Sequence, residues 1–329
     1  MQATLWEPSA RGFFADWEAD GPRVERVATG FIFTEGPVWV PHLPGGAGLL
    51  FSDIPADTVY RWRPGDVQAQ VWRRPSGHSN GMTLDREGRL LTCEHHRRRL
   101  TRTDLRGGQA YGEEPVVLAA RHAGRRLNSP NDVVVRSDGT VYFTDPTYGL
   151  RDDFGKDAPA HEEQERRRIY RLPAAIAAGL PAVPQPGVPL APPEPLPAGD
   201  GPVQPNGLVL SPDERVLYVG DSEGGRLHAF DVALDGGCGG GRLVHTFDRS
   251  MGDGNPDGMR ADAEGRIWCT GPGGLWVFAP DARPLAHVRF PEVTANVAFA
   301  EDDRRTLFVT ASTSVYRLRV TVPGVPGRA

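Results

Sequence analysis

Six short polar segments recur along the chain, and each is followed by an apolar run, a turn and a second apolar run. The first residues of these segments, termed the start residues, are Glu35, Asn80, Asn131, Asn206, Asp257 and Asn296. They are separated by about 40 to 75 residues, and repeats of this length indicate a radial or solenoidal array of β-sheets. The periodicity therefore predicts a repeat architecture in which equivalent positions of successive repeats can meet.

Each repeat has the pattern of a β-hairpin. In the second repeat, Asn80–Asp85 leads into the turn Arg86–Gly88, and Arg89–Glu94 returns as the second strand. The Asp-Gly and Glu-Gly pairs of these turns supply the positive φ that a tight reversal requires. The flanking runs are short and rich in β-branched and aromatic residues, as strands are.

A third apolar segment follows each hairpin. These segments are Val59–Trp62, Leu100–Asp104, Ile169–Leu172, Leu227–Asp231, Leu275–Phe278 and Val315–Leu318. Six hairpins with six third strands predict an all-β fold, a six-bladed β-propeller with a central metal site. We expect residues 23–27, which precede the first complete repeat, to close the ring by completing the last blade.

The repeats extend over most of the chain, so residues 1–329 are predicted to form a single domain. The longest interval contains an insertion, 148–205, expected near the mouth of the channel. Its first part, 148–168, is polar and charged and suggests a short helix or a lid. The second part, 173–205, is rich in proline and alanine and predicts a loop, with helical character only in 172–180.

Composition excludes several classes of protein. The formal net charge is −5, so the chain lacks the basic surface that nucleic-acid binding needs. The three cysteines form neither a disulfide framework nor a zinc motif; Cys93 and Cys269 are expected in buried strands and Cys238 in a glycine-rich turn. Residues 1–20 do not resemble a signal peptide, and no run is long enough to cross a bilayer. We therefore expect a cytoplasmic protein without a membrane partner, and the oligomeric state is left open.

The start residues predict the position of a metal site. Inner strands of a propeller all run in the same direction along the axis, so residues that begin them collect at one mouth of the channel. Glu35, Asn131, Asn206 and Asp257 would meet there and offer two carboxylates and two amide oxygens. Such oxygen ligands suit Ca²⁺, although another divalent cation is also possible. The alternative interpretation is structural, because Asn-Gly and Asp-Gly pairs also form turns. Glu35 is not a turn former and favours the metal site.

Four motifs carry a resemblance to a known family. They are Phe33–Trp39, Ser129–Val133, Gln204–Glu214 and Asn255–Asp262. In these motifs the chain resembles the regucalcin/gluconolactonase (senescence-marker-protein-like) family, and Cys93–His95 and Phe143–Gly149 look more like its bacterial lactonase branch. The resemblance implies a six-bladed propeller, a divalent metal, usually calcium, and hydrolysis of a sugar lactone. It implies Glu35, Asn131, Asn206 and Asp257 as the metal ligands.

The resemblance also suggests catalytic and substrate-binding residues. Asp257 is implied as a base as well as a ligand, although a bound cation depresses the pKa of its carboxylate ligands and makes them poor bases. His95 and His78 are the alternative proton carriers, since related propellers, the paraoxonases, use histidines from a similar region. The alternative interpretation places both histidines on the rim.

Four residues are candidates for substrate binding: Asn80, His78, Ser129 and Tyr148. Ser129 occupies the position at which animal members carry a sugar-contacting arginine, so the animal pocket does not transfer to this chain. Asp145 and Asp221 end second strands. A regular hairpin would place these two aspartates at the mouth opposite the metal, and a bulged strand would place them nearer to it. A structural role is the favoured interpretation for both.

The predicted reaction is hydrolysis of a sugar lactone, in which the metal polarises the carbonyl and water attacks it. Two alternatives share the scaffold. One is another esterase or phosphotriesterase activity, because the same metal polarises a phosphoryl oxygen. The other is a non-enzymatic propeller that binds a metal or ligand, since fold alone does not determine activity.

Overall fold

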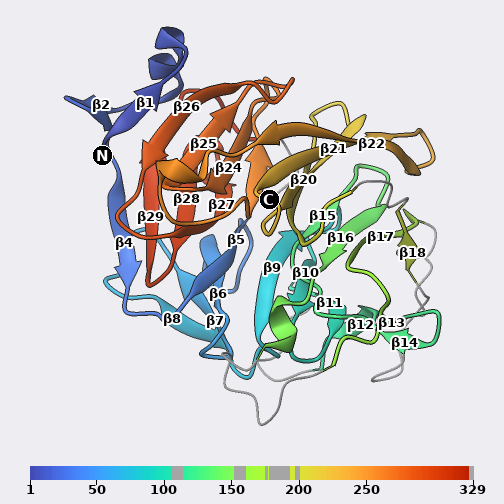
Figure 1. The fold of residues 1–329 in the computed structure, drawn as a ribbon. Helices are drawn as coiled ribbons and strands as arrows, with labels where there is room; N and C mark the ends of the chain where they lie inside the picture. The colour runs from blue at the N-terminus through green and yellow to red at the C-terminus, as the bar shows by residue number, and fades with distance from the viewer. Residues whose placement is uncertain (106–113, 152–160, 175–176, 178–192, 197–200, 326–329) are drawn as a thin grey trace.

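The computed structural model describes residues 1–105, 114–151, 161–174, 177, 193–196 and 201–325 and forms a six-bladed β-propeller (Figure 1). Blades 1 to 6 are antiparallel sheets arranged in sequence order around a central channel, and each packs on its two neighbours. The fold predicted from the repeats is therefore confirmed.

Within each blade the strands follow one another from the channel to the rim. The inner strands are β5 (Thr34–Val40), β9 (Ser79–Leu84), β15 (Val133–Val135), β19 (Pro205–Leu210), β23 (Met259–Ala261) and β27 (Thr294–Ala300). The second strands are β6 (Gly48–Asp53), β10 (Leu90–Glu94), β16 (Val141–Asp145), β20 (Val216–Asp221), β24 (Ile267–Gly271) and β28 (Thr306–Ala311). The third strands are β7 (Thr58–Trp62), β11 (Arg99–Thr103), β17 (Arg168–Leu172), β21 (Arg226–Val232), β25 (Gly274–Phe278) and β29 (Ser314–Arg319).

The outer strands are β8 (Gln70–Arg73), β12 (Val116–Ala119), β18 (Glu194–Pro195), β22 (Cys238–Thr246), β26 (Pro284–Arg289) and, in blade 6, β4 (Glu25–Thr29). Two short hairpins and three 3-10 turns complete the described elements: β2 (Trp17–Glu18), β3 (Gly21–Pro22), β13 (Arg121–His122), β14 (Arg125–Arg126), η1 (Pro8–Phe13), η2 (Tyr148–Leu150) and η4 (Arg249–Met251). Within the described ranges, no helix is long and apolar enough to cross a membrane.

The ring closes by pairing the two ends of the chain. β4 lies antiparallel to β29, with Thr29 opposite Ser314 and Glu25 opposite Arg317. The prediction that an N-terminal segment completes the last blade is thus confirmed, with the strand two residues later than expected. A second N-terminal strand, β1 (Ala3–Leu5), adds a fifth strand to blade 5 beside β26, which the repeat pattern did not predict.

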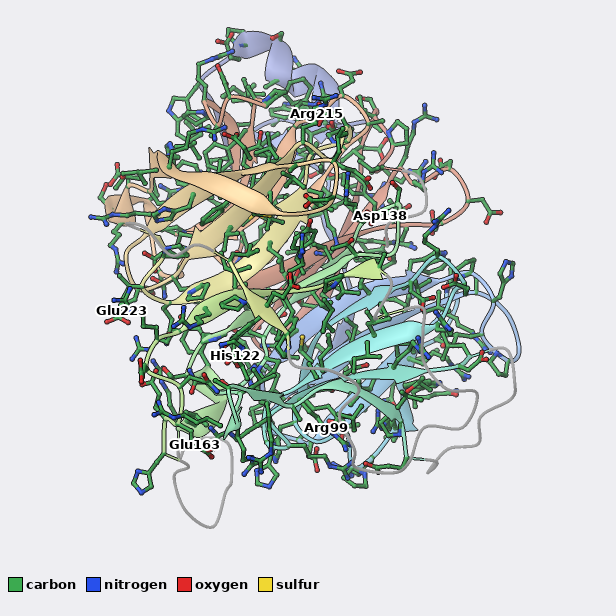
Figure 2. The ribbon with its side chains drawn as sticks, turned by 90° about the vertical axis from the view of Figure 1, so that its right-hand side faces the viewer. Arg99, His122, Asp138, Glu163, Arg215 and Glu223 are labelled. Carbon is green, nitrogen blue, oxygen red and sulfur yellow. The ribbon has the colours of Figure 1, made fainter. Side chains whose placement is uncertain are left out.

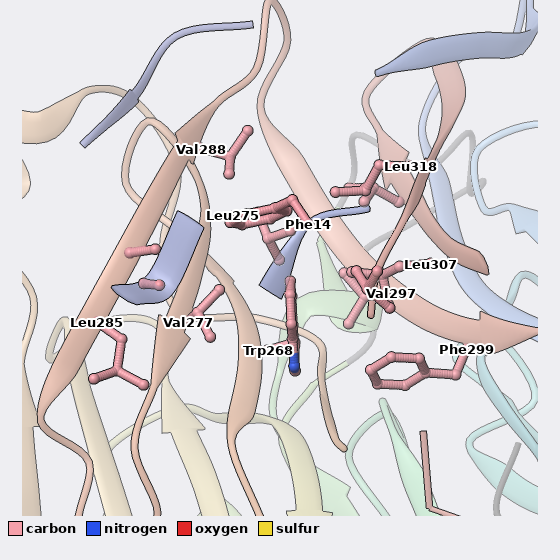
Figure 3. Packing of buried hydrophobic residues seen from close by; sticks show 14 of the residues in the cluster. Phe14, Trp268, Leu275, Val277, Leu285, Val288, Val297, Phe299, Leu307 and Leu318 are labelled. Atoms are coloured by element: carbon pink, nitrogen blue, oxygen red, sulfur yellow. The ribbon is translucent and has the colours of Figure 1, made fainter. Parts of the chain in front are cut away.

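Apolar side chains from adjacent blades fill the spaces between the sheets. Between blades 5 and 6, Trp268 and Leu275 pack in one cluster with Val297 and Leu307 (Figure 3). All four side chains are fully buried, and such burial contributes about 25 cal/mol per Å² of apolar surface. The propeller is therefore held by contacts between blades rather than by one central core, which leaves the axis available for polar groups.

Two cysteines lie where the sequence predicted and one does not. Cys93 and Cys269 are buried, in β10 and β24. Cys238 is the first residue of β22 rather than part of the preceding turn, because the strand of blade 4 extends into the glycine-rich segment.

The insertion is tied to the blades by charged pairs. Arg98 of blade 2 binds Glu163 at 3.0 Å, and Arg167 binds Glu223 of blade 4, also at 3.0 Å; Glu163 and Glu223 lie at the outer edge of the ribbon (Figure 2). Part of the expected lid, 152–160, and most of the helical segment 172–180, namely 175–176 and 178–180, lie outside the described residues.

Candidate functional site

The inner strands are irregular at the start residues. In four blades the pairing register with the second strand shifts there: between Glu35 and Val38, Ser79 and Met82, Pro205 and Leu208, and Thr294 and Asn296. In the other two blades, Asn131 and Asp257 precede β15 and β23. Irregular pairing turns a side chain out of the strict alternation of a strand and commonly occurs beside functional sites. We term the end of the channel at which the start residues lie the start mouth. The opposite end, where a turn joins the first and second strands of each blade, is termed the turn mouth.

The glycines that follow start residues allow the blades to approach closely. A Cβ on Gly36 would lie 2.0 Å from the carbonyl oxygen of Asn80, and one on Gly207 would lie 2.0 Å from that of Asp257. Gly207 does not have positive φ and lies within β19. Turn formation therefore does not explain the Asn206-Gly207 pair, and contact between the inner ends of neighbouring blades does.

Two carboxylates meet across the channel at the start mouth. Glu35 belongs to blade 1 and Asp257 to blade 5, and their side chains lie within hydrogen-bonding reach of each other. Blade 6 separates these two blades around the ring, so the side chains can meet only on the axis. Burial raises the pKa of Glu35 to about 7 and raises the pKa of Asp257 further above its usual range, and the neighbouring carboxylates add to both shifts. The arrangement brings two buried carboxylates together and favours their protonated forms until a positive charge binds beside them.

Asn206 and Asn131 are each held by hydrogen bonds. The Nδ2 of Asn206 donates to Ser222 Oγ at 2.9 Å, and Ser222 Oγ donates to the carbonyl of Pro256 at 2.6 Å. The Oδ1 of Asn206 is buried and has no hydrogen-bond partner within the described ranges. Asn131 is held by its backbone, since its N–H donates to Thr144 and its carbonyl accepts from Gly81.

These residues fit a hard cation. An unpartnered amide oxygen and two adjacent buried carboxylates are the donors that Ca²⁺ prefers. Over the described part of the chain, no group of three or more His, Cys, Asp and Glu side chains could hold a metal ion. A cation site here therefore depends on the asparagine oxygens, and it resembles a calcium site more than a zinc site.

His95 lies beside Asn80 at the same mouth. Asn80 Nδ2 is 3.1 Å from His95 Nε2, and both residues are buried. The Oδ1 of Asn80 has no hydrogen-bond partner among the described residues. Because the amide nitrogen can only donate, this contact puts the proton of a neutral His95 ring on Nδ1.

Tyr148 reaches the site from the insertion. It begins η2, its hydroxyl is hydrogen-bonded to Ser222, and the negative charge of Asp257 acts on it. Burial is the main cause that raises the pKa of Tyr148 to about 12, so the phenol is neutral at physiological pH. Tyr148 is therefore a neutral hydrogen-bonding group beside Asn206 and Asp257.

Ser129 and His78 are engaged in local structure. Ser129 Oγ donates to Pro146 and accepts the N–H of Gly149, at 2.7 and 2.9 Å, which fixes the turn that carries Tyr148. The Nδ1 of His78 lies 2.7 Å from the carbonyl of Ile54, and its ring lies 5.5 Å from that of His96. Direct substrate contact by either residue stays a prediction, and the geometry favours an indirect role for Ser129.

Of the two positions expected for Asp145 and Asp221, the one opposite the metal mouth is wrong. Asp221 lies opposite Pro205 in the β19–β20 pair, so it is at the start mouth. An antiparallel second strand returns to the end where the first began, which the expectation overlooked. These aspartates, like Asp53, accept backbone N–H groups of the segment that leads into the inner strand: Phe33 to Asp53, Asn128 to Asp145 and Gln204 to Asp221. This contact supports their structural interpretation.

Comparison with known proteins identifies the family. Residues 33–178 and 197–313 match the model described as the SMP-30/Gluconolactonase/LRE-like region. The chain belongs to the SMP-30/gluconolactonase family. It is 32% identical to a gluconolactonase of Zymomonas mobilis, over 92% of this chain and 82% of the relative. It is 27% identical to regucalcin of Sus scrofa, over 84% of this chain and 82% of the relative. A solved gluconolactonase structure from Xanthomonas campestris superposes with a TM-score of 0.80 at 29% identity and covers 98% of this chain and 95% of that one.

Sequence reasoning missed four residues of this SMP-30/gluconolactonase site. Asn296 Nδ2 donates to Glu35 at 3.0 Å, and Ser222 holds the amide of Asn206. Asp132 and Arg260 are buried and form a pair in the channel, described below. Asn296 and Asp132 had a signal, since one is a start residue and the other follows one. The only sequence signal of Arg260 was a charged residue within the apolar strand β23, and Ser222 carried no sequence signal.

Proposed function

We propose that the protein hydrolyses a sugar lactone at the start mouth, with a divalent cation, calcium by preference, held by Glu35, Asn131, Asn206 and Asp257. The names of the relatives support the lactone as substrate. The observation that carries the proposal is the meeting of Glu35 and Asp257 on the axis, beside the unpartnered Oδ1 of Asn206. Buried oxygen ligands that lie this close together are best explained by a metal cation that binds between them.

The cation, when bound, supplies Lewis-acid polarisation of the lactone carbonyl. The chain's own residues supply binding and proton transfer. A water adds to the carbonyl carbon and gives up a proton, the ring C–O bond breaks, and the ring oxygen takes up that proton. His95 can carry that proton because its ring is held by Asn80 at 3.1 Å. Asp257 binds the cation, and any role as base is secondary because a bound cation lowers carboxylate basicity.

Substrate recognition falls to groups around the same mouth. The free Oδ1 of Asn80 can accept a sugar hydroxyl, and the neutral phenol of Tyr148 can donate or accept one. Ser129 contributes by holding the turn of Tyr148. His78, on the rim, would contact only a larger substrate.

A chelation experiment with a substrate panel tests the proposal. The protein is stripped with EDTA and assayed by pH-stat on an aldonolactone, an aryl ester and a phosphotriester, before and after return of Ca²⁺, Mg²⁺, Mn²⁺ or Zn²⁺. We expect lactone hydrolysis that chelation removes and Ca²⁺ restores. Preference for one of the other esters would favour an esterase or phosphotriesterase. Calcium binding without hydrolysis of any ester would favour a binding protein, and full activity after exhaustive stripping would contradict the metal role.

A further inference from the structure

A buried arginine, Arg260, enters the central channel from blade 5. Its neighbours in β23, Met259 and Ala261, pack in the apolar cluster beside blade 4, and Arg260 is only 5% exposed. Its Nη1 donates to the carbonyl of Met259 at 2.8 Å and lies 3.9 Å from Asp132 Oδ2 of blade 3. Blades 3 and 5 are not adjacent in the ring, so the two charges meet on the axis.

The pair is incompletely hydrogen-bonded. The Nε and Nη2 of Arg260 and the Oδ2 of Asp132 are buried and have no hydrogen-bond partner among the described residues. Burying such groups is costly unless their charges are compensated. An arginine cannot shed its proton to escape that cost. Packing alone would therefore select an apolar residue at this position, and the charge of Arg260 needs another explanation.

The surrounding carboxylates supply that explanation. Asp132, Glu35 and Asp257 influence one another through their negative charges, and Asn296 bridges Glu35 and Asp132 by hydrogen bonds. The positive charge of Arg260 acts on both Glu35 and Asp132. A bound cation favours the ionised carboxylates. In that state the three carboxylates and Arg260 together carry two net negative charges, the amount that one divalent cation neutralises.

We propose that Arg260 is a built-in counter-cation that holds the channel carboxylates together without metal and matches the site to a divalent ion. It is a positioning residue, and the inference rests on the proposed cation site. Its charge stabilises the metal-free protein and weakens cation binding by repulsion, so its removal has opposite effects on these two properties. Removal also leaves three net negative charges, which favours trivalent over divalent ions.

Calorimetric titration and thermal unfolding of the full chain test this inference. In Arg260→Met, we expect Ca²⁺ to bind about tenfold more tightly and Tb³⁺ to gain more than Ca²⁺, since Coulomb energy scales with charge. The metal-free variant should melt several degrees lower, and bound Ca²⁺ should restore most of the loss. Arg260→Lys, which keeps the charge, should stay close to wild type. Arg242→Met, which removes an exposed partner of Asp231, is the matched control and should change neither property.

The double variant Asp132→Asn/Arg260→Met removes both members of the pair and should restore Ca²⁺ affinity and metal-free stability toward wild type. Weaker or unchanged Ca²⁺ binding in Arg260→Met, with Arg260→Lys behaving identically, would overturn the inference and indicate a role of shape. If the wild type bound no cation, the proposed function would fail. The metal-free melting temperatures would still decide whether Arg260 neutralises the carboxylates, since destabilisation by Arg260→Met and rescue by Asp132→Asn do not require metal.

Discussion

The two mouths of the channel are built from the two ends of the same strands, and they treat carboxylates differently. In blade 5, Asp257 lies before β23 at the start mouth and Asp262 follows it at the turn mouth. Asp262 accepts from Arg266 Nε at 2.7 Å and Trp268 Nε1 at 3.0 Å. Asp257 lies among other carboxylates, and Arg260 lies 3.9 Å from Asp132 of the same cluster.

The hairpin of blade 2 repeats the arrangement of the turn mouth. Asp85 accepts from Arg89 Nε at 2.6 Å and from the backbone N–H of Glu87 at 3.0 Å. A carboxylate that has its own arginine and backbone donors is explained by the fold. A carboxylate whose nearest neighbours are other carboxylates is not, and such groups indicate a ligand. The hydrogen-bonding and charged partners of a carboxylate distinguish the two cases, whereas its residue type and its burial do not.

The largest expected effect comes from exchanging the two aspartates of blade 5 for asparagine. Asp257→Asn should lower kcat for lactone hydrolysis by at least about 10³-fold, because a ligand and its charge are lost. Asp262→Asn should keep kcat within about threefold and lose about 1–3 kcal/mol of unfolding free energy, because charged hydrogen bonds to Arg266 and Trp268 weaken. A pH-stat assay and urea unfolding measure these changes. Equal losses of activity in the two variants would remove the distinction between the mouths.

His95→Gln tests proton transfer at the start mouth. We expect kcat to fall about 10²-fold and the acid limb of the pH–rate profile to disappear, since glutamine cannot carry a proton. His96→Gln is the control and should retain the profile, because the His96 side chain is exposed and its ring lies 5.5 Å from that of His78. An unchanged profile in His95→Gln would assign the proton to another group.

Ser222→Ala tests the support of the Asn206 amide. Loss of the 2.9 Å hydrogen bond frees the amide to rotate, so kcat/KM and Ca²⁺ affinity should each fall about tenfold, with about 1 kcal/mol lost in stability. Ser222→Thr keeps the hydroxyl and should recover most of the affinity. Calcium titration of the two variants compares them, and equal affinity in both would show that Asn206 does not depend on this contact.

The smallest effect is expected away from both mouths, in β26. Burial lowers the pKa of His287 to about 4 from a usual value of 6.5. Between these values the unfolded chain takes up a proton that the folded chain does not, so stability is complete above pH 6.5 and falls as pH drops toward 4. His287→Gln should flatten this dependence and leave activity at pH 7 unchanged. Urea midpoints from pH 4 to 8 measure the slope, and an identical slope in the variant would assign it to other groups.

Much of the fold could be predicted because its signals are local. The apolar runs of β5 and β28, the Asp-Gly turns and the third strands are each readable within about ten residues. The added strand β1 could not be predicted, because it is a fifth strand of blade 5 and lies outside the repeat that the pattern defines. The mouth of Asp221 was misjudged for another reason, namely the direction of the returning strand, which sequence pattern alone did not make explicit.

The sequence alone determined that six similar hairpins follow one another, and that Glu35 and Asp257 hold equivalent positions in them, because turn chemistry and strand alternation act between near neighbours. Only the tertiary structure decided which side chains share the axis. Ring closure brings Arg260 beside Asp132. Folding of the blade 4 hairpin brings Ser222 to Asn206. Electrostatic and hydrogen-bonding partners depend on distance in space, and in a closed ring that distance is unrelated to separation along the chain.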